Sequence, residues 1–288
     1  MNLLLTGIFL LFVGLIGLIP FRVLYLFSDF IRFLLQRVIG YRKKVIIDNL
    51  KGSFPELPEK ELKCTIRSVY KNLADVTVEG IKGFSMTHRQ VKQRHFFLNP
   101  EIVETYLGQG KSIIALPSHF NNWEWGSLSP GLFTKYPIIA FYKPLSNKYI
   151  DRFLQKSRSK FGTQLGSIYK TALIFQRNAN VPSIYIMAAD QSPTNAKKSY
   201  WVQFLGRDTA FLHGPEKYAR MYNMPVIYAD VQRVRRGFYT MKISVITEDP
   251  SEMEEGAITK AYAAKLEEAI RRNPGSWLWS HRRWKLSR

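Results

Sequence analysis

The expected fold is decided by residues 112–126, SIIALPSHFNNWEWG. The stretch begins with a short apolar run of the kind that forms a buried strand. His119 and Glu124 follow this run, and Asn121 or Asn122 lies where the N-cap of a helix would be. Because open α/β sheets place their chemistry beyond the carboxyl ends of their strands, the stretch predicts a functional site.

His119 and Glu124 form the candidate catalytic pair. On one continuous helix, residues i and i+5 point about 140° apart, so the two side chains could not meet there. If His119 instead precedes the helix, Glu124 falls in its first turn and can reach back to the imidazole. Such a carboxylate fixes the tautomer of the imidazole and raises its basicity, as a general base requires. The alternative interpretation is a strand-to-helix turn in which both side chains only cap the helix.

Apolar and alternating runs elsewhere predict that strands and helices alternate along the chain. The predicted strands are 112–117, 137–142, 183–188, 200–205, 225–231 and 238–245, and the predicted helices are 122–131, 147–160, 171–178, 214–222 and 255–272. This order is typical of an α/β protein with a central mixed, largely parallel sheet that helices flank. In a parallel sheet, Asp190 would share an edge with His119, because it follows the strand at 183–188.

The N-terminus predicts contact with a membrane. Residues 1–21 carry no charged side chain, and their length is about that needed to cross a bilayer core of roughly 30 Å. We expect them to form a transmembrane anchor, and the basic residues after it place the remaining chain in the cytoplasm. Residues 22–40 carry one narrow polar stripe, which predicts an amphipathic helix in the membrane interface, with a buried core helix as the alternative. Residues 41–288 would then form the catalytic domain.

The composition narrows the class of partner. Lys and Arg number 42 against 22 Asp and Glu, and the formal net charge is +20. This charge favours an anionic partner, which could be nucleic acid, an anionic membrane surface or a phosphorylated substrate, and the apolar N-terminus favours lipid. Cys64 is the only cysteine and the five histidines do not cluster, so we expect no disulfide, no metal and no cofactor. The absence of a G-x-S-x-G elbow argues against a serine hydrolase.

Two basic stretches are further site candidates. Arg158 lies at the end of a predicted helix, before a turn at Gly162, where it could also be a solvated cation. The run WLWSHRRWK, residues 277–285, interleaves aromatic side chains with cations, including Arg282 and Arg283. Such a run could stack on nucleic-acid bases or lie at lipid headgroups, and the predicted anchor favours the headgroups.

Five blocks in order along the chain carry a resemblance to a known family. They are Tyr41-Arg42 with Asn49-Leu50 and Phe54-Pro55; His119-x4-Glu124; Tyr142-Lys143-Pro144 with Arg158 and Gly162; Asp190-Gln191 with Phe204-x-Gly206 and Gly214; and Trp277-x-Trp279-x-His281-Arg282-Arg283-Trp284-Lys285. With these blocks the chain resembles the bacterial lipid A late acyltransferases, membrane-bound enzymes of the lysophospholipid acyltransferase superfamily.

The resemblance implies a reaction and a set of residues. His119 would act as the general base on an acceptor hydroxyl and Glu124 would orient it, while the acyl group would come from a thioester on acyl carrier protein or coenzyme A. The acceptor would be a lipid A precursor at the cytoplasmic side of the cell inner membrane, and no nucleic acid would bind. The residues implied to bind substrate are Asn121, Asn122, Lys143, Arg158, Asp190, Arg282 and Arg283.

Two other functions stay open from the sequence. The same chemistry could serve another lipid acceptor, such as a lysophospholipid, an aminolipid or a different glycolipid. A protein of another class would be a membrane-tethered module that binds anionic lipid or nucleic acid through its charge, without catalysis.

Overall fold

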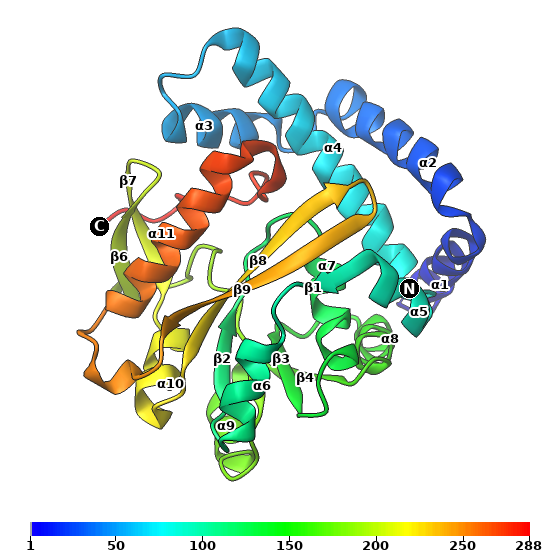
Figure 1. Ribbon diagram of the computed structural model, residues 1–288. Coiled ribbons are helices and arrows are strands. Elements are labelled where there is room, and N and C mark those ends of the chain that lie inside the picture. The colour runs from blue at the N-terminus through cyan, green and yellow to red at the C-terminus, as the bar shows by residue number, and fades with distance from the viewer. Residues whose placement is uncertain (1) are drawn as a thin grey trace.

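A seven-stranded sheet forms the centre of the computed structural model, which describes residues 2–288 (Figure 1). The strand order is β1-β9-β8-β2-β5-β3-β4, and the β8–β9 pair is antiparallel while the other pairs are parallel. The strands are β1 (His95–Phe97), β2 (Ile113–Leu116), β3 (Ile138–Tyr142), β4 (Thr163–Ser167), β5 (Ile184–Ile186), β8 (Val226–Arg235) and β9 (Phe238–Thr247), and β6 (Ser199–Phe204) and β7 (Arg207–Leu212) form a separate hairpin. The predicted α/β fold with a mixed, largely parallel sheet is confirmed.

Helices cover both faces of this sheet. They are α1 (Asn2–Leu18), α2 (Phe21–Phe33), α3 (Lys43–Ser53), α4 (Glu59–Gly83), α5 (His88–Arg94), α6 (Glu101–Gly108), α7 (Trp123–Leu128), α8 (Lys148–Ser159), α9 (Thr171–Arg177), α10 (Gly214–Tyr222) and α11 (Ala257–Arg272). Side chains of α9, α10 and α11 share one hydrophobic core, and α5, α6 and α7 contribute to cores on the other side.

Strand β2 is buried along its whole length because it lies between these two layers. Ile114 and Leu116 belong to the core that α9, α10 and α11 share, whereas Ile113 and Ala115 belong to the core that contains α6. Alternate residues of a strand point to opposite faces of a sheet. The uninterrupted apolar run in the sequence is therefore what a central parallel strand requires.

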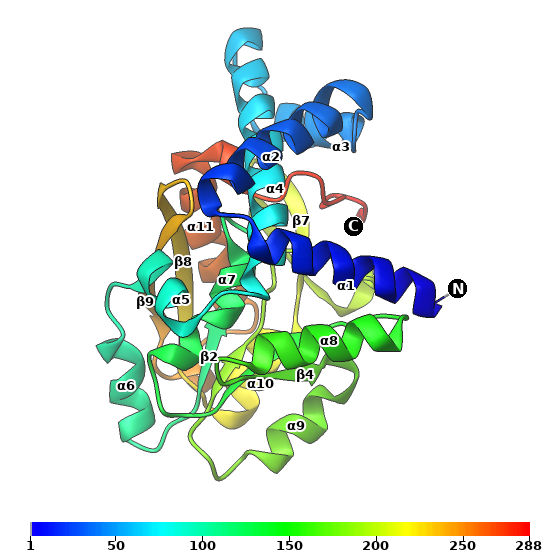
Figure 2. The same ribbon diagram turned by 90° about the vertical axis from the view of Figure 1, so that its right-hand side faces the viewer.

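The N-terminal helix differs from its prediction. Helix α1 has 17 residues, and within residues 2–288 no helix combines the length and the apolar character needed to cross a membrane. The predicted transmembrane helix is thus unsupported, and Met1 lies outside the described residues. Helix α1 packs on α4 and runs beside α8 (Figure 2). The Lys82 ammonium of α4 donates to the carbonyl oxygens of Gly17 and Ile19 at the end of α1, and Phe9 contacts Phe153 of α8 edge to face.

The predicted helix at 22–40 is present as α2, followed by a π-helical turn at Leu34–Val38. Its buried residues are Leu24 and Ser28, which face α4. The opposite side of α2 is apolar and exposed, since Leu26 is 71% and Phe30 is 55% exposed. A position in the membrane interface stays a prediction.

Candidate active site

A histidine and an aspartate meet at the carboxyl edge of the sheet. His119 follows β2 and Asp190 follows β5, and these two strands are parallel neighbours. The Nδ1 atom of His119 lies 2.7 Å from Oδ1 of Asp190, and the backbone N–H of His119 donates to Oδ2 at 2.8 Å. The indole N–H of Trp277 donates to the same Oδ2 at 2.9 Å. The prediction that Asp190 shares an edge with His119 is confirmed.

The contact between His119 and Asp190 shifts the pKa values of both side chains, although the pair is largely buried. Burial by itself would raise the pKa of Asp190, but the His119 charge and the hydrogen bonds of His119 and Trp277 hold it at about 2. Burial also lowers the pKa of His119, and the nearby carboxylate of Asp190 outweighs this effect, so the imidazole pKa is raised above its ordinary value. Asp190 is therefore an ionised group that stabilises positive charge on His119.

The second ring nitrogen of His119 contacts Gln191 at the wall of a cavity. Because Nδ1 faces a carboxylate, the neutral imidazole carries its proton on Nδ1 and leaves the lone pair on Nε2. Nε2 lies 3.1 Å from the side-chain nitrogen of Gln191. His119 lines a cavity of about 490 Å³, together with Glu124, Lys143, Arg158 and Gln191. Within residues 2–288, no group of three or more His, Cys, Asp or Glu side chains could hold a metal ion.

Glu124 pairs with an arginine instead of with His119. Its Oε2 atom lies 2.7 Å from the Nη2 atom of Arg158, and the side chains of Glu124 and Arg158 are 30% and 20% exposed. The predicted hydrogen bond between the imidazole and the Glu124 carboxylate is not formed, because Asp190 contacts Nδ1 and Gln191 contacts Nε2. Glu124 still acts on His119 through its charge, which contributes to the raised pKa of the imidazole after the larger effects of burial and Asp190. Its catalytic role stays a prediction.

The two asparagines shape the turn between β2 and α7. Asn122 is the N-cap of α7, as predicted, since its side-chain oxygen accepts the backbone N–H of Trp125 at 2.9 Å. Asn121 has a φ of 50°, and its side-chain amide donates to the Val231 carbonyl at 2.7 Å. Asparagine tolerates this left-handed backbone better than most residues. Both side chains belong to fully buried residues that are absent from the cavity wall, so they position the loop that carries His119.

The other predicted cations lie in different environments. Lys143 is exposed and lines the cavity of His119. Arg282 is exposed but does not line that cavity. Arg283 is only 2% exposed; its guanidinium donates to the Ala210 carbonyl at 2.7 Å and lies 4.4 Å from the centre of the Phe211 ring. The structure thus brings Lys143 and Arg158 to the site and places Arg283 in the core.

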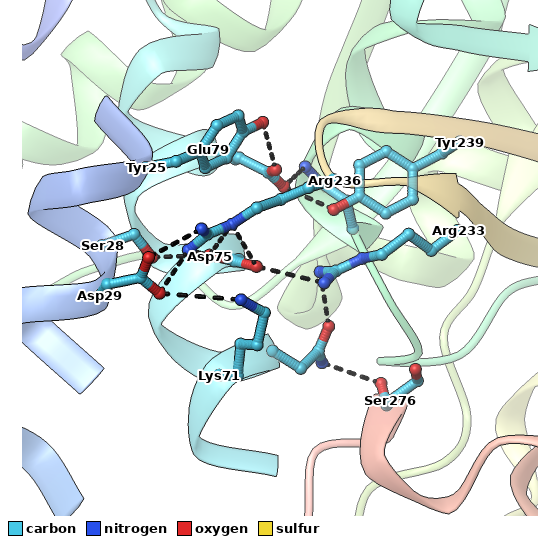
Figure 3. Close-up of polar contacts among 12 residues, drawn as sticks. Tyr25, Ser28, Asp29, Lys71, Asp75, Glu79, Arg233, Arg236, Tyr239 and Ser276 are labelled. Atoms are coloured by element: carbon cyan, nitrogen blue, oxygen red, sulfur yellow. Dashed lines mark hydrogen bonds and ion pairs between the residues drawn. The ribbon is translucent and has the colours of Figure 1, made fainter. Parts of the chain in front are cut away.

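A buried pair of acids on α4 has no counterpart in the sequence-based site. Asp75 and Glu79 are both fully buried. Asp75 accepts hydrogen bonds from Arg233 of β8 and from Arg236 at the β8–β9 turn, and Arg236 also donates to Asp29 of α2 (Figure 3). The hydroxyl groups of Tyr25 and Tyr239 point toward Glu79 (Figure 3) and donate to it. Asp75 and Glu79 are four residues apart, as residues on one face of a helix are. The local sequence therefore does not indicate that these acids contact distant elements.

Two mainly apolar cavities adjoin the His119 cavity. One measures about 50 Å³ and shares with it the residues Pro117, Gly126, Ile186 and Met241. The other, about 370 Å³, is lined by residues of α1, α4, α7 and α8 and shares Glu124 and Arg158 with the His119 cavity. The site therefore offers apolar walls on both sides of its polar centre.

These features define a class of protein. A His–Asp pair beside apolar cavities suits an enzyme that activates a polar group next to an apolar one. Residues 2–286 match the family described as bacterial lipid A biosynthesis acyltransferase, so the chain belongs to this family and is an acyltransferase. The chain is also similar to the "Lipid A biosynthesis acyltransferase" of Haemophilus influenzae (strain ATCC 51907 / DSM 11121 / KW20 / Rd). The identity is 24% over 280 residues, which are 95% of this chain and 84% of the relative.

Proposed function

We propose that this acyltransferase moves a fatty acyl group from a thioester, on acyl carrier protein or coenzyme A, to a hydroxyl of a lipid A precursor. The observation that carries the proposal is the contact of 2.7 Å between His119 and Asp190, which leaves Nε2 as the basic nitrogen at the cavity. The family supports acyl transfer in lipid A synthesis, and the proposal adds the donor, the base and the place of reaction.

His119 supplies the base that the acceptor needs. A hydroxyl is a weak nucleophile at neutral pH, and a positioned base contributes about 10²- to 10⁴-fold. Nε2 removes the hydroxyl proton while the oxygen bonds to the thioester carbonyl carbon, and Asp190 stabilises the imidazolium. When the tetrahedral intermediate collapses, the C–S bond breaks and the imidazolium returns the proton to the leaving sulfur. This sequence balances without a covalent acyl-enzyme.

Arg158 is the candidate to stabilise the oxyanion. Its guanidinium lies at the cavity wall beside Glu124. The Nε–H of Arg158 is buried and has no hydrogen-bond partner within residues 2–288. Cationic donors fixed near developing negative charge are a major source of catalysis. Lys143, at the same wall, supplies a positive charge for a phosphate of the acceptor.

The apolar cavity beside Gly126 suits the last carbons of the donor's acyl chain, because its volume of about 50 Å³ has room for only a few methylene groups. Its wall includes Phe97, Val103, Phe133 and Ile243 and contacts the His119 cavity through Met241. Methionine side chains are flexible, so Met241 can turn aside as a chain enters. Each methylene group that leaves water contributes about 0.8 kcal/mol to binding.

The outer side of α1 and α2 supports binding to a lipid surface. Its exposed apolar residues include Leu4, Leu11, Leu18, Leu26, Phe30 and Phe33, each at least 50% exposed. Soluble proteins rarely expose apolar patches of this kind unless the patch meets a partner or a membrane. Basic residues follow in the chain, from Arg37 to Lys44, and they favour the anionic cytoplasmic leaflet of the inner membrane.

A direct assay tests the function. The purified protein is mixed with a lipid A precursor in anionic vesicles and with an acyl thioester of either acyl carrier protein or coenzyme A. The masses of the lipid products are measured by mass spectrometry. We expect the precursor to gain one acyl group by an ester bond. Acylation of a lysophospholipid but not of the precursor would overturn the proposed acceptor.

A further inference from the structure

Glu79 is a buried carboxylate that the transfer mechanism does not use. It is 0% exposed. Its Oε1 accepts the Tyr25 hydroxyl at 2.8 Å, and its Oε2 accepts both the Tyr239 hydroxyl and the Asn122 amide at 2.7 Å. A buried acid is costly unless it is fully hydrogen-bonded. Burial raises the pKa of Glu79, and the Arg233 charge opposes this rise.

One of these hydrogen bonds reaches the turn that carries His119. The amide of Asn122 donates to Glu79 through its nitrogen and caps α7 through its oxygen, so both ends of the amide are used. The Glu79 carbonyl also accepts the Trp125 indole N–H at 2.9 Å. In the next position of α4, a Cβ added to Gly80 would lie 3.1 Å from the Glu124 side chain, which shows how closely α4 and α7 approach. Glu79 therefore fixes the start of α7.

A different hydrogen bond of Glu79 reaches α2. Tyr25 is supplied by α2, and Figure 3 shows its hydroxyl directed at Glu79 from the side opposite Tyr239. One turn further along α2, the Ser28 hydroxyl donates to Asp75 at 2.7 Å. The polar side of α2 thus contacts α4, while its apolar side, with Leu26, is exposed.

Asn72 of α4 is connected to Asn121, the residue before Asn122, through hydrogen bonds to a shared carbonyl group. Arg233, held by Asp75, donates to the Asn72 side-chain oxygen at 2.9 Å. The Asn72 amide in turn donates to the Ser276 carbonyl at 3.0 Å, and the backbone N–H of Asn121 donates to the same carbonyl at 2.8 Å. Glu79 thus contacts Asn122 directly. Asn72 and the backbone of Asn121 donate to the same Ser276 carbonyl.

We propose that Glu79 is a positioning residue for acyl transfer, which links the outward-facing helix α2 to the turn between His119 and α7. The inference rests on the proposed function. When α2 is seated on a lipid surface, Tyr25 stays bound to Glu79, and Glu79 keeps Asn122 and the start of α7 in place. When α2 moves away, Glu79 loses one of its three donors and the turn loosens. Misplacement of a catalytic group by about 1 Å can cost roughly 10²-fold in rate.

The first test removes one hydroxyl group from this link. Tyr25→Phe deletes the hydrogen bond from α2 and leaves the contact of Glu79 with Asn122. Its matched control is Tyr106→Phe, which deletes a similar tyrosine–glutamate hydrogen bond of 3.0 Å to Glu248, on residues outside the His119 cavity. We expect Tyr25→Phe to lower kcat about tenfold with KM within twofold, and Tyr106→Phe to leave both unchanged. Equal kcat values for the two variants would overturn the proposal.

The second test alters Glu79 itself. Glu79→Gln keeps an oxygen for Asn122 but cannot accept all three donors. The control is Glu216→Gln, because Glu216 is also a buried glutamate, 1% exposed, that accepts hydrogen bonds from Thr259. We expect the melting temperature to fall by a similar amount in both variants. Only Glu79→Gln should have a lower kcat, with KM unchanged. A loss of stability without a larger loss of kcat than in the control would reduce Glu79 to a structural role and contradict the proposal.

The third measurement does not depend on acyl transfer. Hydrogen exchange of the segment 119–126 is followed with and without anionic vesicles. Vesicles should slow this exchange in the wild-type protein and in Tyr106→Phe, but not in Tyr25→Phe. If vesicles slow exchange in Tyr25→Phe as much as in the wild-type protein, the proposed connection from α2 through Tyr25 and Glu79 to this segment is contradicted. If the wild-type protein transfers no acyl group while the exchange result holds, the proposed function fails and the link stands.

Discussion

The Nδ1 atom of His119 lies 2.7 Å from Oδ1 of Asp190, although the two residues are 71 positions apart in the chain. The acid that contacts the imidazole therefore comes from the neighbouring strand end. The acid within the local motif, Glu124, instead holds Arg158 at 2.7 Å. We therefore propose different tasks for the two carboxylates: Asp190 would orient His119 as the base, and Glu124 would hold the Arg158 cation beside it.

Replacement of the two acids should separate these tasks. Asp190→Asn should lower kcat roughly 10²- to 10⁴-fold, because an amide no longer stabilises the imidazolium or fixes its tautomer. Glu124→Gln should cost less, about tenfold, since its amide oxygen still accepts from Arg158. Steady-state kinetics with melting curves as the control for folding would measure both. A larger loss in Glu124→Gln than in Asp190→Asn would show that the local pair is the working one.

The rate should depend on pH through His119. The base acts in its neutral form, and the carboxylate of Asp190 raises the imidazole pKa against the opposing effect of burial. The profile of kcat/KM should therefore rise with pH and reach its midpoint above about 6.5, the ordinary histidine value. In Asp190→Asn, burial stays but the raising charge is lost, so the midpoint should move to lower pH. A profile whose midpoint is the same in both proteins would argue against His119 as the titrating base.

Gly126 should set which donor chains fit. It lies between the His119 cavity and the smaller apolar cavity, and an added Cβ would meet only the Met241 methyl group, at 3.8 Å. Gly126→Leu should fill this passage and shift the preferred donor by about two to four carbons toward shorter chains, since an apolar pocket discriminates between substrates that differ by one methylene group by about 1–3 kcal/mol. Gly108→Leu is the control, because Gly108 has open space around its Cβ position. Competition between donors of mixed length measures the shift, and an unchanged preference would remove this cavity from the donor site.

The exposed side of α2 should carry membrane affinity. Leu26→Lys places a charge on a residue that is 71% exposed, so the fold should tolerate it while the apolar contact with lipid is lost. Burying one leucine is worth about 1.5–3 kcal/mol, which predicts at least tenfold weaker binding to vesicles of neutral lipid. Leu173→Lys on α9, at a leucine that is 40% exposed, is the matched control. Sedimentation with vesicles measures the binding, and equal binding of both variants would contradict a lipid-facing α2.

The central strands of the sheet could be predicted from the sequence, because the strands around β2 are apolar runs with clear ends. The sequence missed β1, β4 and β7 for identifiable reasons. β1 has three residues, and β4 reads Thr-Gln-Leu-Gly-Ser, which is polar because it pairs only with β3 at the sheet edge. The pattern of β7, Arg-Asp-Thr-Ala-Phe-Leu, begins with two charged residues, of which Asp208 is exposed and Arg207 lies over the Trp284 ring.

The site was predictable where it followed from strand ends and helix caps. Asp190 and the cap at Asn122 were found in this way, whereas the partner of Glu124 was not. A contact between Glu124 and Arg158 joins α7 to α8, and the contacts of Glu79 join α2, α4 and β9. Such contacts depend on how elements pack, and a single sequence carries no periodic signal for them.

We propose that His119 is the base for acyl transfer to a hydroxyl. The most direct test of this proposal is a single-turnover assay with a labelled acyl thioester and a lipid A precursor, run with wild-type protein and with His119→Ala at equal vesicle binding and melting temperature. The account predicts that His119→Ala transfers the label about 10²- to 10⁴-fold more slowly. Transfer by His119→Ala within tenfold of the wild-type rate would contradict it.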